Sequence, residues 1–231
     1  METKFEYYYN DVPGKGKCRN NLIYTSLISN DKKTFCQWYH NDTEYHQGQN
    51  QVVDSSLMKE KWLREVNYIT QMRNRFPDLV PKIIDIDLAH RKLYFEIDGP
   101  DFWQLAGPVE QDYDSVLPSW RNQMLDIFKA HKKLGIYKYS LHPSSYFVVD
   151  GKLKSINYFF CYKDHEPMIS LRSVMSHISE DRQADLFPKM AAMGIDVDAP
   201  TPFKDIQLLA FESFKTNFPT GVMDEAKQLY E

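Results

Sequence analysis

The feature that most constrains the fold of this chain is a change in the spacing of its apolar residues. In the first part, β-branched and aromatic residues gather in short runs at 21–28 and 34–40, and again at 83–88 and 92–97. A turn-forming segment separates the members of each pair, which is typical of β-hairpins. Later in the chain, helical spacing dominates. The sequence therefore predicts an α+β fold that is rich in strands first and in helices afterwards.

One predicted helix interrupts the strand-rich part. Between residues 55 and 75, apolar residues recur at helical spacing on one face. The segment 119–134 is also amphipathic, and Gly135 is well placed to end it as a left-handed cap. No internal repeat and no long linker divides the chain. The remaining expected elements are two short strands and two helices, at 145–149, 153–160, 181–193 and 201–217.

Composition and charge exclude several classes of protein. The 231 residues carry 28 Lys and Arg against 32 Asp and Glu, and this lack of a basic excess argues against a nucleic-acid binder. No apolar run approaches the ~20 residues that span a bilayer, and the first residues do not resemble a signal peptide. Cys18, Cys36 and Cys161 form no paired motif, which predicts neither a disulfide framework nor a metal site. We expect a cytoplasmic protein that binds neither nucleic acid nor membrane.

The order of the elements, together with several local strings, resembles the protein-kinase-like fold. Residues 59–69 resemble the helix that carries the family's glutamate, which falls here on Glu65. Residues 92–103 resemble the fifth strand and the hinge after it, and they include Glu96 and Asp98. This resemblance covers about residues 12–160.

The resemblance implies an α+β, two-lobed architecture. The β-rich N-lobe, with its single helix, would occupy residues 1–105, and the helical C-lobe would occupy residues 106–231. The part of the chain beyond residue 160 is short for a kinase C-lobe. We therefore expect a reduced C-lobe.

At the positions that the resemblance assigns to catalysis, the chemistry is missing. The family's catalytic loop and metal-binding triplet correspond to residues 138–145 and to the end of 153–159. The general-base aspartate becomes Ser140, the metal-binding asparagine becomes Ser145, and the metal-binding aspartate becomes Asn157. A serine hydroxyl cannot act as the base at neutral pH, and an amide attracts Mg²⁺ far less than a carboxylate does.

The phosphate-binding motifs of the N-lobe are also incomplete. The glycine-rich loop corresponds to Gly14 and Gly16, with Arg19 in place of the third glycine. The lysine of the third strand is replaced by Gln37 or Trp38, and Trp38 would then fill part of the nucleotide space. The candidate ligand cleft consists of seven residues: Gly14, Gly16, Arg19, Trp38, Glu65, Glu96 and Asp98.

With all of these motifs lost or incomplete, the chain resembles a pseudokinase. This resemblance implies a binding or regulatory module with no cofactor and with an unidentified protein partner. A divergent small-molecule kinase or nucleotide-binding enzyme, holding ATP without Mg²⁺ through non-standard residues, is the alternative. A third is an unrelated α+β protein in which Ser140 and Asn157 lie apart. The strings 13–17 and 37–40 also resemble uncharacterised proteins of phages of marine cyanobacteria, which implies a host-cell cytoplasmic setting.

The same residues also have purely structural interpretations. Loop serines such as Ser140 and Ser145 often form turns, and an asparagine such as Asn157 often caps a strand. A helical glutamate such as Glu65 commonly faces water. The spatial arrangement of these side chains distinguishes the two interpretations.

Overall fold

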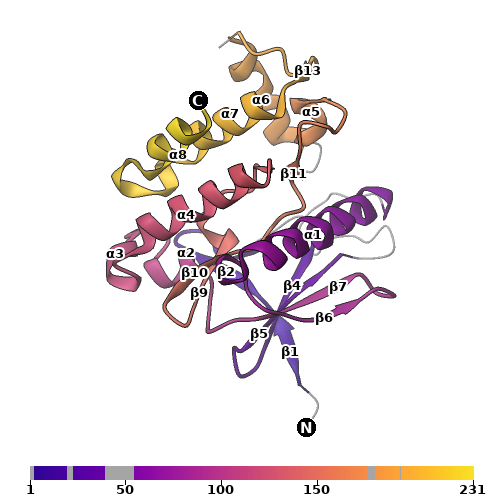
Figure 1. Ribbon diagram of the computed structural model, residues 1–231. Helices are drawn as coiled ribbons and strands as arrows, with labels where there is room; N and C mark the ends of the chain where they lie inside the picture. The colour runs from indigo at the N-terminus through magenta and orange to yellow at the C-terminus, as the bar shows by residue number, and fades with distance from the viewer. Residues whose placement is uncertain (1–2, 20–22, 40–54, 176–179, 193) are drawn as a thin grey trace.

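A computed structural model describes residues 3–19, 23–39, 55–175, 180–192 and 194–231. It is a mixed α+β structure, as the sequence predicts. An antiparallel sheet lies at one end of the molecule and most of the helices lie at the other, with residues 5–7 and 222–230 far apart (Figure 1).

The main sheet has five antiparallel strands in the order β1-β4-β5-β7-β6. Both predicted hairpins are confirmed: one pairs β4 with β5, and the other pairs β6 with β7. A separate hairpin joins β2 to β3. The strand bounds are β1 Phe5–Tyr7, β2 Tyr9–Val12, β3 Gly16–Arg19, β4 Thr25–Ser29, β5 Thr34–Trp38, β6 Ile83–Asp87 and β7 Lys92–Glu96.

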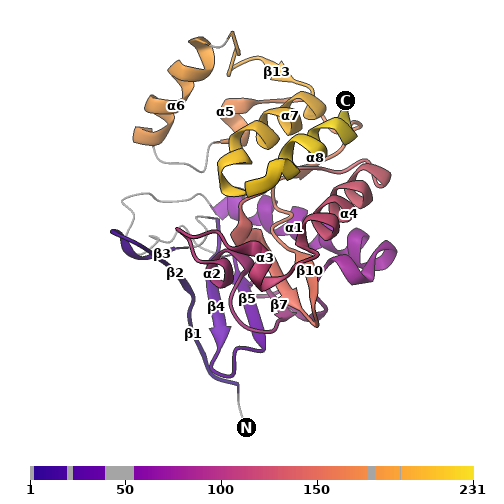
Figure 2. The same ribbon diagram turned by 90° about the vertical axis from the view of Figure 1, so that its left-hand side faces the viewer.

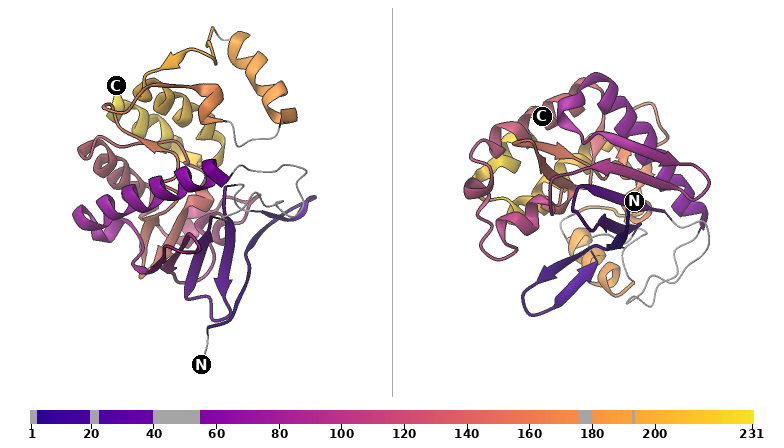
Figure 3. Two further views of the ribbon diagram at one scale, coloured as in Figure 1. Left: turned by 90° about the vertical axis from the view of Figure 1, so that its right-hand side faces the viewer. Right: turned by 90° about the horizontal axis from the view of Figure 1, so that it is seen from below.

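The long helix α1 (Ser55–Arg75) follows β5 in the chain and confirms the predicted helix. Met58, Ile69 and Met72 recur at helical spacing and form an apolar stripe on this helix. The stripe is buried, since each of the three side chains is at most 1% exposed. In two perpendicular views the helix lies between the sheet and the C-terminal helices (Figures 1 and 3). This position lets side chains of α1 reach both halves of the molecule.

Helices dominate the second half, where α4, α6 and α7 confirm the three helices expected there with slightly different ends. Helix α8 was not predicted, although its buried residues recur at helical spacing (Val222, Met223, Ala226 and Tyr230). It packs on α4 and α7. The bounds are α2 Phe102–Ala106, α3 Tyr113–Val116, α4 Trp120–Lys133, α5 Leu171–Val174, α6 Glu180–Ala192, α7 Phe203–Phe214 and α8 Val222–Tyr230, with single 3-10 turns η1 Pro77–Leu79, η2 Pro143–Ser145, η3 Lys215–Asn217 and η4 Pro219–Gly221.

Short strand pairs connect the helices of this half. The predicted strand over 153–160 was too long, because β10 ends at Ser155. The backbone then turns at Asn157, whose φ of 66° is incompatible with an extended strand. The pairs are β9 (Tyr146–Val149) with β10 (Lys152–Ser155), β8 (Tyr137–Lys138) with β11 (Cys161–Tyr162), and β12 (Ile169–Ser170) with β13 (Pro200–Thr201).

A single hydrophobic core runs through both halves. Where the sheet meets the second half, Phe35 of β5 packs on Phe147 of β9, with ring centroids 5.0 Å apart. Tyr24 packs edge-on against Phe159 at 5.9 Å. None of the helices in the described ranges is long and apolar enough to cross a membrane.

Candidate functional site

A buried cluster of neutral polar side chains lies where the sheet meets the second half of the molecule. Asn157 is at its centre. Its Oδ1 accepts hydrogen bonds from Tyr24 Oη at 2.6 Å and from Gln37 Nε2 at 2.8 Å. Its Nδ2 donates to Ser145 Oγ at 2.9 Å, and the hydroxyls of Ser145 and Ser140 are 3.2 Å apart. We call these five residues the Asn157 cluster.

Local structure explains why these side chains meet. Side chains alternate along a strand, so Phe35 and Gln37 of β5 share the face that contacts the second half. The turn after β10 places Asn157 on the same side, and the Ile156 N–H donates to the Ser145 carbonyl at 2.9 Å. Asparagine tolerates the left-handed backbone of position 157 better than most residues do.

Four of the five residues of the Asn157 cluster are buried, and Ser140 is partly exposed. Gln37 is 0% exposed, Ser145 is 1% exposed and Asn157 is 2% exposed. Most buried polar groups in proteins are hydrogen-bonded. Gln37 Oε1 is an exception in this cluster, since it has no hydrogen-bond partner among the described residues. Here the central amide uses both its acceptor and its donor capacity within the protein.

Two buried charged residues lie beside the cluster. Glu65 of α1 and Lys138 of β8 are both 0% exposed, and each charge favours the ionised form of the other. Burial raises the pKa of Glu65 to about 7, against the opposing effect of Lys138. Burial lowers the pKa of Lys138 to about 8. The Tyr39 hydroxyl donates to the Glu65 carboxylate at 3.4 Å, so Glu65 does not face water.

Lys138 is held from several directions. Its Nζ donates to the Ser140 carbonyl, which joins it to the Asn157 cluster. The same Nζ lies 5.6 Å from the ring centroid of Tyr146 and 5.5 Å from that of Tyr158. Its backbone N–H donates to the buried side chain of Gln207 in α7 at 2.7 Å. These contacts fix the loop that carries Ser140.

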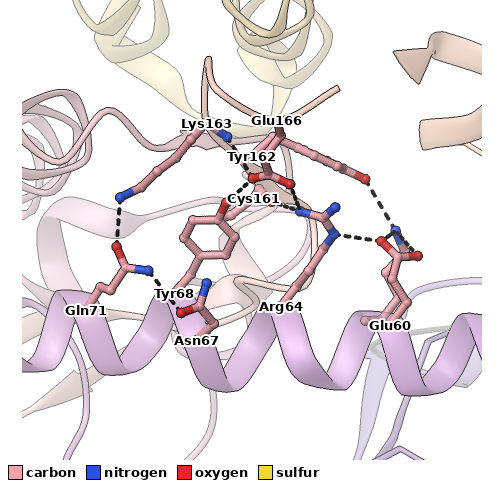
Figure 4. A network of polar contacts seen from close by, with 10 residues as sticks. Glu60, Arg64, Asn67, Tyr68, Gln71, Cys161, Tyr162, Lys163 and Glu166 are labelled. Carbon is pink, nitrogen blue, oxygen red and sulfur yellow. Dashed lines mark hydrogen bonds and ion pairs between the residues drawn. The ribbon is translucent and has the colours of Figure 1, made fainter. Parts of the chain in front are cut away.

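A second polar network ties α1 to the segment that follows β11 (Figure 4). Arg64 binds the Glu166 carboxylate at 2.6 Å and the Cys161 carbonyl at 3.0 Å. Tyr68 also donates to Glu166, and Lys163 Nζ donates to Gln71 Oε1 at 2.7 Å. We call Arg64, Tyr68, Gln71, Lys163 and Glu166 the α1 clamp. Since Glu65 is next to Arg64 in the helix, the clamp also positions Glu65.

The structure brings some of the predicted site residues together. Ser140 and Asn157 both hydrogen-bond to Ser145, and Glu65 lies close by through Tyr39 and Lys138. Tyr24, Gln207 and Lys138 were not predicted as site residues. The sequence does carry a signal for Lys138, because this lysine lies in the mainly apolar stretch between Ile136 and Leu141.

Other predicted cleft residues do not join the cluster. Trp38 alternates with Gln37 on β5, and its ring faces Lys92 Nζ at 4.6 Å. Of the two residues, it is therefore Gln37 that reaches the Asn157 cluster. Glu96 pairs with Lys82 at 3.3 Å, and Asp98 pairs with Lys33, both on the exposed surface.

The two predicted loop glycines lie at the tip of the β2–β3 hairpin. Gly14 and Gly16 have φ values of 76° and 68°, which explains the choice of glycine. No atom lies within 4 Å of where a Cβ would be at either position, so the hairpin tip is open. Arg19 ends β3, and its side chain lies outside the described residues.

The Asn157 cluster is not equipped for acid–base or metal chemistry by itself. Its five members are neutral and are hydrogen-bonded to one another. Across the described ranges, no group of three or more His, Cys, Asp or Glu side chains is arranged so that it could hold a metal ion. The charged groups that act on the cluster include the buried carboxylates of Glu65 and Asp101, which both affect Tyr24, and the amine of Lys138, which donates to the Ser140 carbonyl.

Comparisons with known proteins add no assignment. No protein-family model matches the chain, and a search of curated proteins finds no significant match. The function is therefore inferred from the residues and their geometry.

Proposed function

We propose that this chain is a catalytically inactive, kinase-like protein that works as a binding or regulatory module. One observation carries the proposal. Ser140, Ser145 and Asn157, the positions that the resemblance assigns to the base and the metal ligands, are joined by hydrogen bonds in one cluster, which also contains Gln37. The β9–β10 hairpin by itself brings Ser145 and Asn157 together. A chance match gives no reason for Gln37, at the strand-lysine position of the resemblance, to reach Asn157 as well. This favours the kinase-like interpretation over an unrelated α+β protein.

The arrangement of elements also supports the proposal. The main sheet has five antiparallel strands, and α1 follows β5, the third of these strands in chain order. Most of the helices come after the sheet. This order of elements is consistent with a kinase-like N-lobe and C-lobe. In this proposal residues 1–105 form the first lobe, and residues 106–231 form the shortened second lobe. The Asn157 cluster would then lie between them.

The chemistry of the cluster supports an inactive protein. Phosphoryl transfer requires Mg²⁺ and an oriented acceptor. The Asn157 amide is neutral, and its oxygen already accepts two hydrogen bonds. Ser140 offers a hydroxyl where the family has a carboxylate. Glu65, which would pair with the strand lysine in the family, is instead contacted by Tyr39 and faces the charge of Lys138.

A module without catalysis acts through a partner, and we propose that the partner is a protein. The resemblance to phage proteins supports a host-cell protein in the cytoplasm as that partner. The net charge of −4 is consistent with a partner other than nucleic acid.

The test is a phosphoryl-transfer assay with labelled ATP and Mg²⁺ on the purified protein. We expect no transfer to the protein itself, to generic protein substrates or to small molecules. Robust transfer that Asn157→Ala abolishes would overturn the proposal.

A thermal-shift titration with ATP separates the proposal from a divergent nucleotide-binding enzyme. A ligand at 100 times its Kd stabilises the folded state by ~2.7 kcal/mol, so binding at millimolar ATP gives a clear shift. We expect a flat response with and without Mg²⁺. A shift that persists in EDTA would instead support ATP binding without the metal.

A further inference from the structure

A surface groove lies between α7, α8 and the segment 195–201, away from the Asn157 cluster. Its volume is about 560 Å³. The helices α7 and α8 lie side by side, with β13 next to them (Figure 2). Ile195, Ala199, Leu208 and Leu209 give the groove an apolar floor. We call it the α7–α8 groove.

The rim of the α7–α8 groove is acidic. It carries the carboxylates of Asp196, Asp205, Glu212 and Glu231 against a single amine, that of Lys227. Lys227 pairs with Glu212 at 2.7 Å, so this pair is neutral overall. In the part of the chain that the structure describes, the side chains of the other three carboxylates form no ion pair. Lys204 Nζ also donates to the main-chain oxygen of Glu231 at 3.3 Å, which offsets part of the negative charge. The lining still carries four carboxylates against one amine, so the groove combines exposed apolar surface with a rim of net negative charge.

The apolar floor and the acidic rim together indicate which class of molecule could bind in the groove. Apolar side chains gain from covering the floor, and positive charges gain from approaching the rim. Nucleic acid would be repelled by the carboxylates. A second copy of this chain carries an overall charge of −4 and is a poor electrostatic complement. An amphipathic peptide with apolar residues on one face and lysine or arginine on the other satisfies both features.

We propose that the α7–α8 groove binds a basic, amphipathic segment of a partner protein. The inference rests on the proposed binding role, for which it names the class of partner. The apolar side chains of the segment would lie on Leu208 and Leu209, and its basic side chains would face Asp196, Asp205 and Glu231.

The test is binding of a labelled model peptide, measured by fluorescence anisotropy. The probe is a peptide of about 12 residues, roughly three helical turns, with leucine on one face and lysine on the other. A second peptide keeps the leucines and replaces every lysine with glutamate. We expect the basic peptide to bind, with an affinity that falls as salt rises, and the acidic peptide not to bind.

Matched variants locate the binding surface. Asp196→Asn with Asp205→Asn removes two rim charges from exposed residues, so folding should be preserved. We expect this variant to bind the basic peptide about fivefold more weakly. Asp85→Asn with Asp126→Asn removes the same charge from exposed positions on β6 and α4 and should bind as the parent does.

Three results would overturn the inference: no binding of the basic peptide, equal binding of the acidic peptide, or equal loss in the two double variants. A concentration-dependent dimer that the Asp196→Asn/Asp205→Asn variant disrupts would assign the groove to a second copy instead. The nucleotide assays are independent of these results. Phosphoryl transfer would overturn the inactive-kinase proposal, whereas a failed peptide experiment would overturn the groove assignment alone.

Discussion

At the scale of single residues, Asn157 has the most demanding position in the described structure. It bonds Tyr24, Gln37 and Ser145 at once, and its backbone is left-handed with φ of 66°. An aspartate here would place a second carboxylate near the buried Glu65. The amide is therefore the side chain that fits both the hydrogen bonds and the surrounding charge.

Replacement of Asn157 tests this position. Asn157→Ala leaves Gln37 and Tyr24 without their acceptor and replaces asparagine with a residue that tolerates the left-handed backbone less well, so we expect the free energy of unfolding to fall by about 2–4 kcal/mol. Asn157→Gly loses the same hydrogen bonds without the backbone cost and should be less destabilised than the alanine variant. Urea denaturation measures both. A loss within about 0.5 kcal/mol of the parent for Asn157→Ala would contradict the role of the cluster.

The buried carboxylate of Glu65 makes stability depend on pH. Its pKa is raised from 4.5 to about 7, so between these values the folded protein holds a proton that the unfolded chain has lost. Stability is thus highest below the lower value and falls as pH rises through about 7. We expect Glu65→Gln to reduce this fall, measured by urea denaturation across that range. The exposed Glu110→Gln should keep the parent's pH dependence, and an unchanged fall in Glu65→Gln would contradict the assignment.

Lys138 has the opposite effect on the pH dependence of stability, and this effect occurs at higher pH. Because burial lowers its pKa from 10.5 to about 8, the unfolded chain binds more protons than the folded protein between these values. Stability should therefore rise with pH across this window. Together, Glu65 and Lys138 therefore contribute least to folding stability near neutral pH, between these two pH ranges.

At the scale of elements, the α1 clamp connects a helix of the first half to a loop of the second. The segment around β11 has little regular structure of its own, since β11 comprises only Cys161 and Tyr162. Its position depends on the side chains of α1. Any change in the orientation of α1 would therefore move both this loop and Glu65.

A double-mutant cycle of Arg64→Ala and Glu166→Ala measures the clamp. Both side chains are mostly buried, at 22% and 18% exposure, so we expect a coupling of about 1 kcal/mol or more. Hydrogen exchange in the loop after β11 should accelerate in either single variant. The exposed pair Lys129–Asp126 is the control and should show nearly no coupling. Equal coupling energies in the two cycles would show that the Arg64–Glu166 pair of the α1 clamp is no stronger than an exposed ion pair.

At the scale of the whole molecule, the two halves share one hydrophobic core. The contacts of Phe35 with Phe147 and of Gln37 with Asn157 join the sheet to the second half. Such continuity means that neither half buries its apolar surface alone.

The shared core predicts a single cooperative unfolding transition. Tryptophan fluorescence and far-ultraviolet circular dichroism should give coincident urea curves, because Trp62 and Trp120 report on the two halves and both are buried. Separated transitions would show that the halves unfold independently.

Local pattern was enough to predict much of this chain. The hairpins of β4–β5 and β6–β7, the helices α1 and α4, and the end of α4 near Gly135 follow from the spacing of neighbouring residues and from turn chemistry. Motif spacing also selected Ser140, Ser145 and Asn157, which the structure joins by hydrogen bonds.

Other features depend on contacts between residues far apart in the sequence. The short helix α8 is stabilised by packing on α4 and α7, since a helix of 9 residues is marginal alone. Whether Gln37 or Trp38 reaches the Asn157 cluster depends on which face of β5 meets Asn157. The sequence by itself thus determined the two hairpins of the main sheet, the main helices and the neutral chemistry of the candidate site, because these depend on residue type and near neighbours. Only the tertiary structure decided that Glu65 and Lys138 are buried beside that site, because burial is a property of the whole fold.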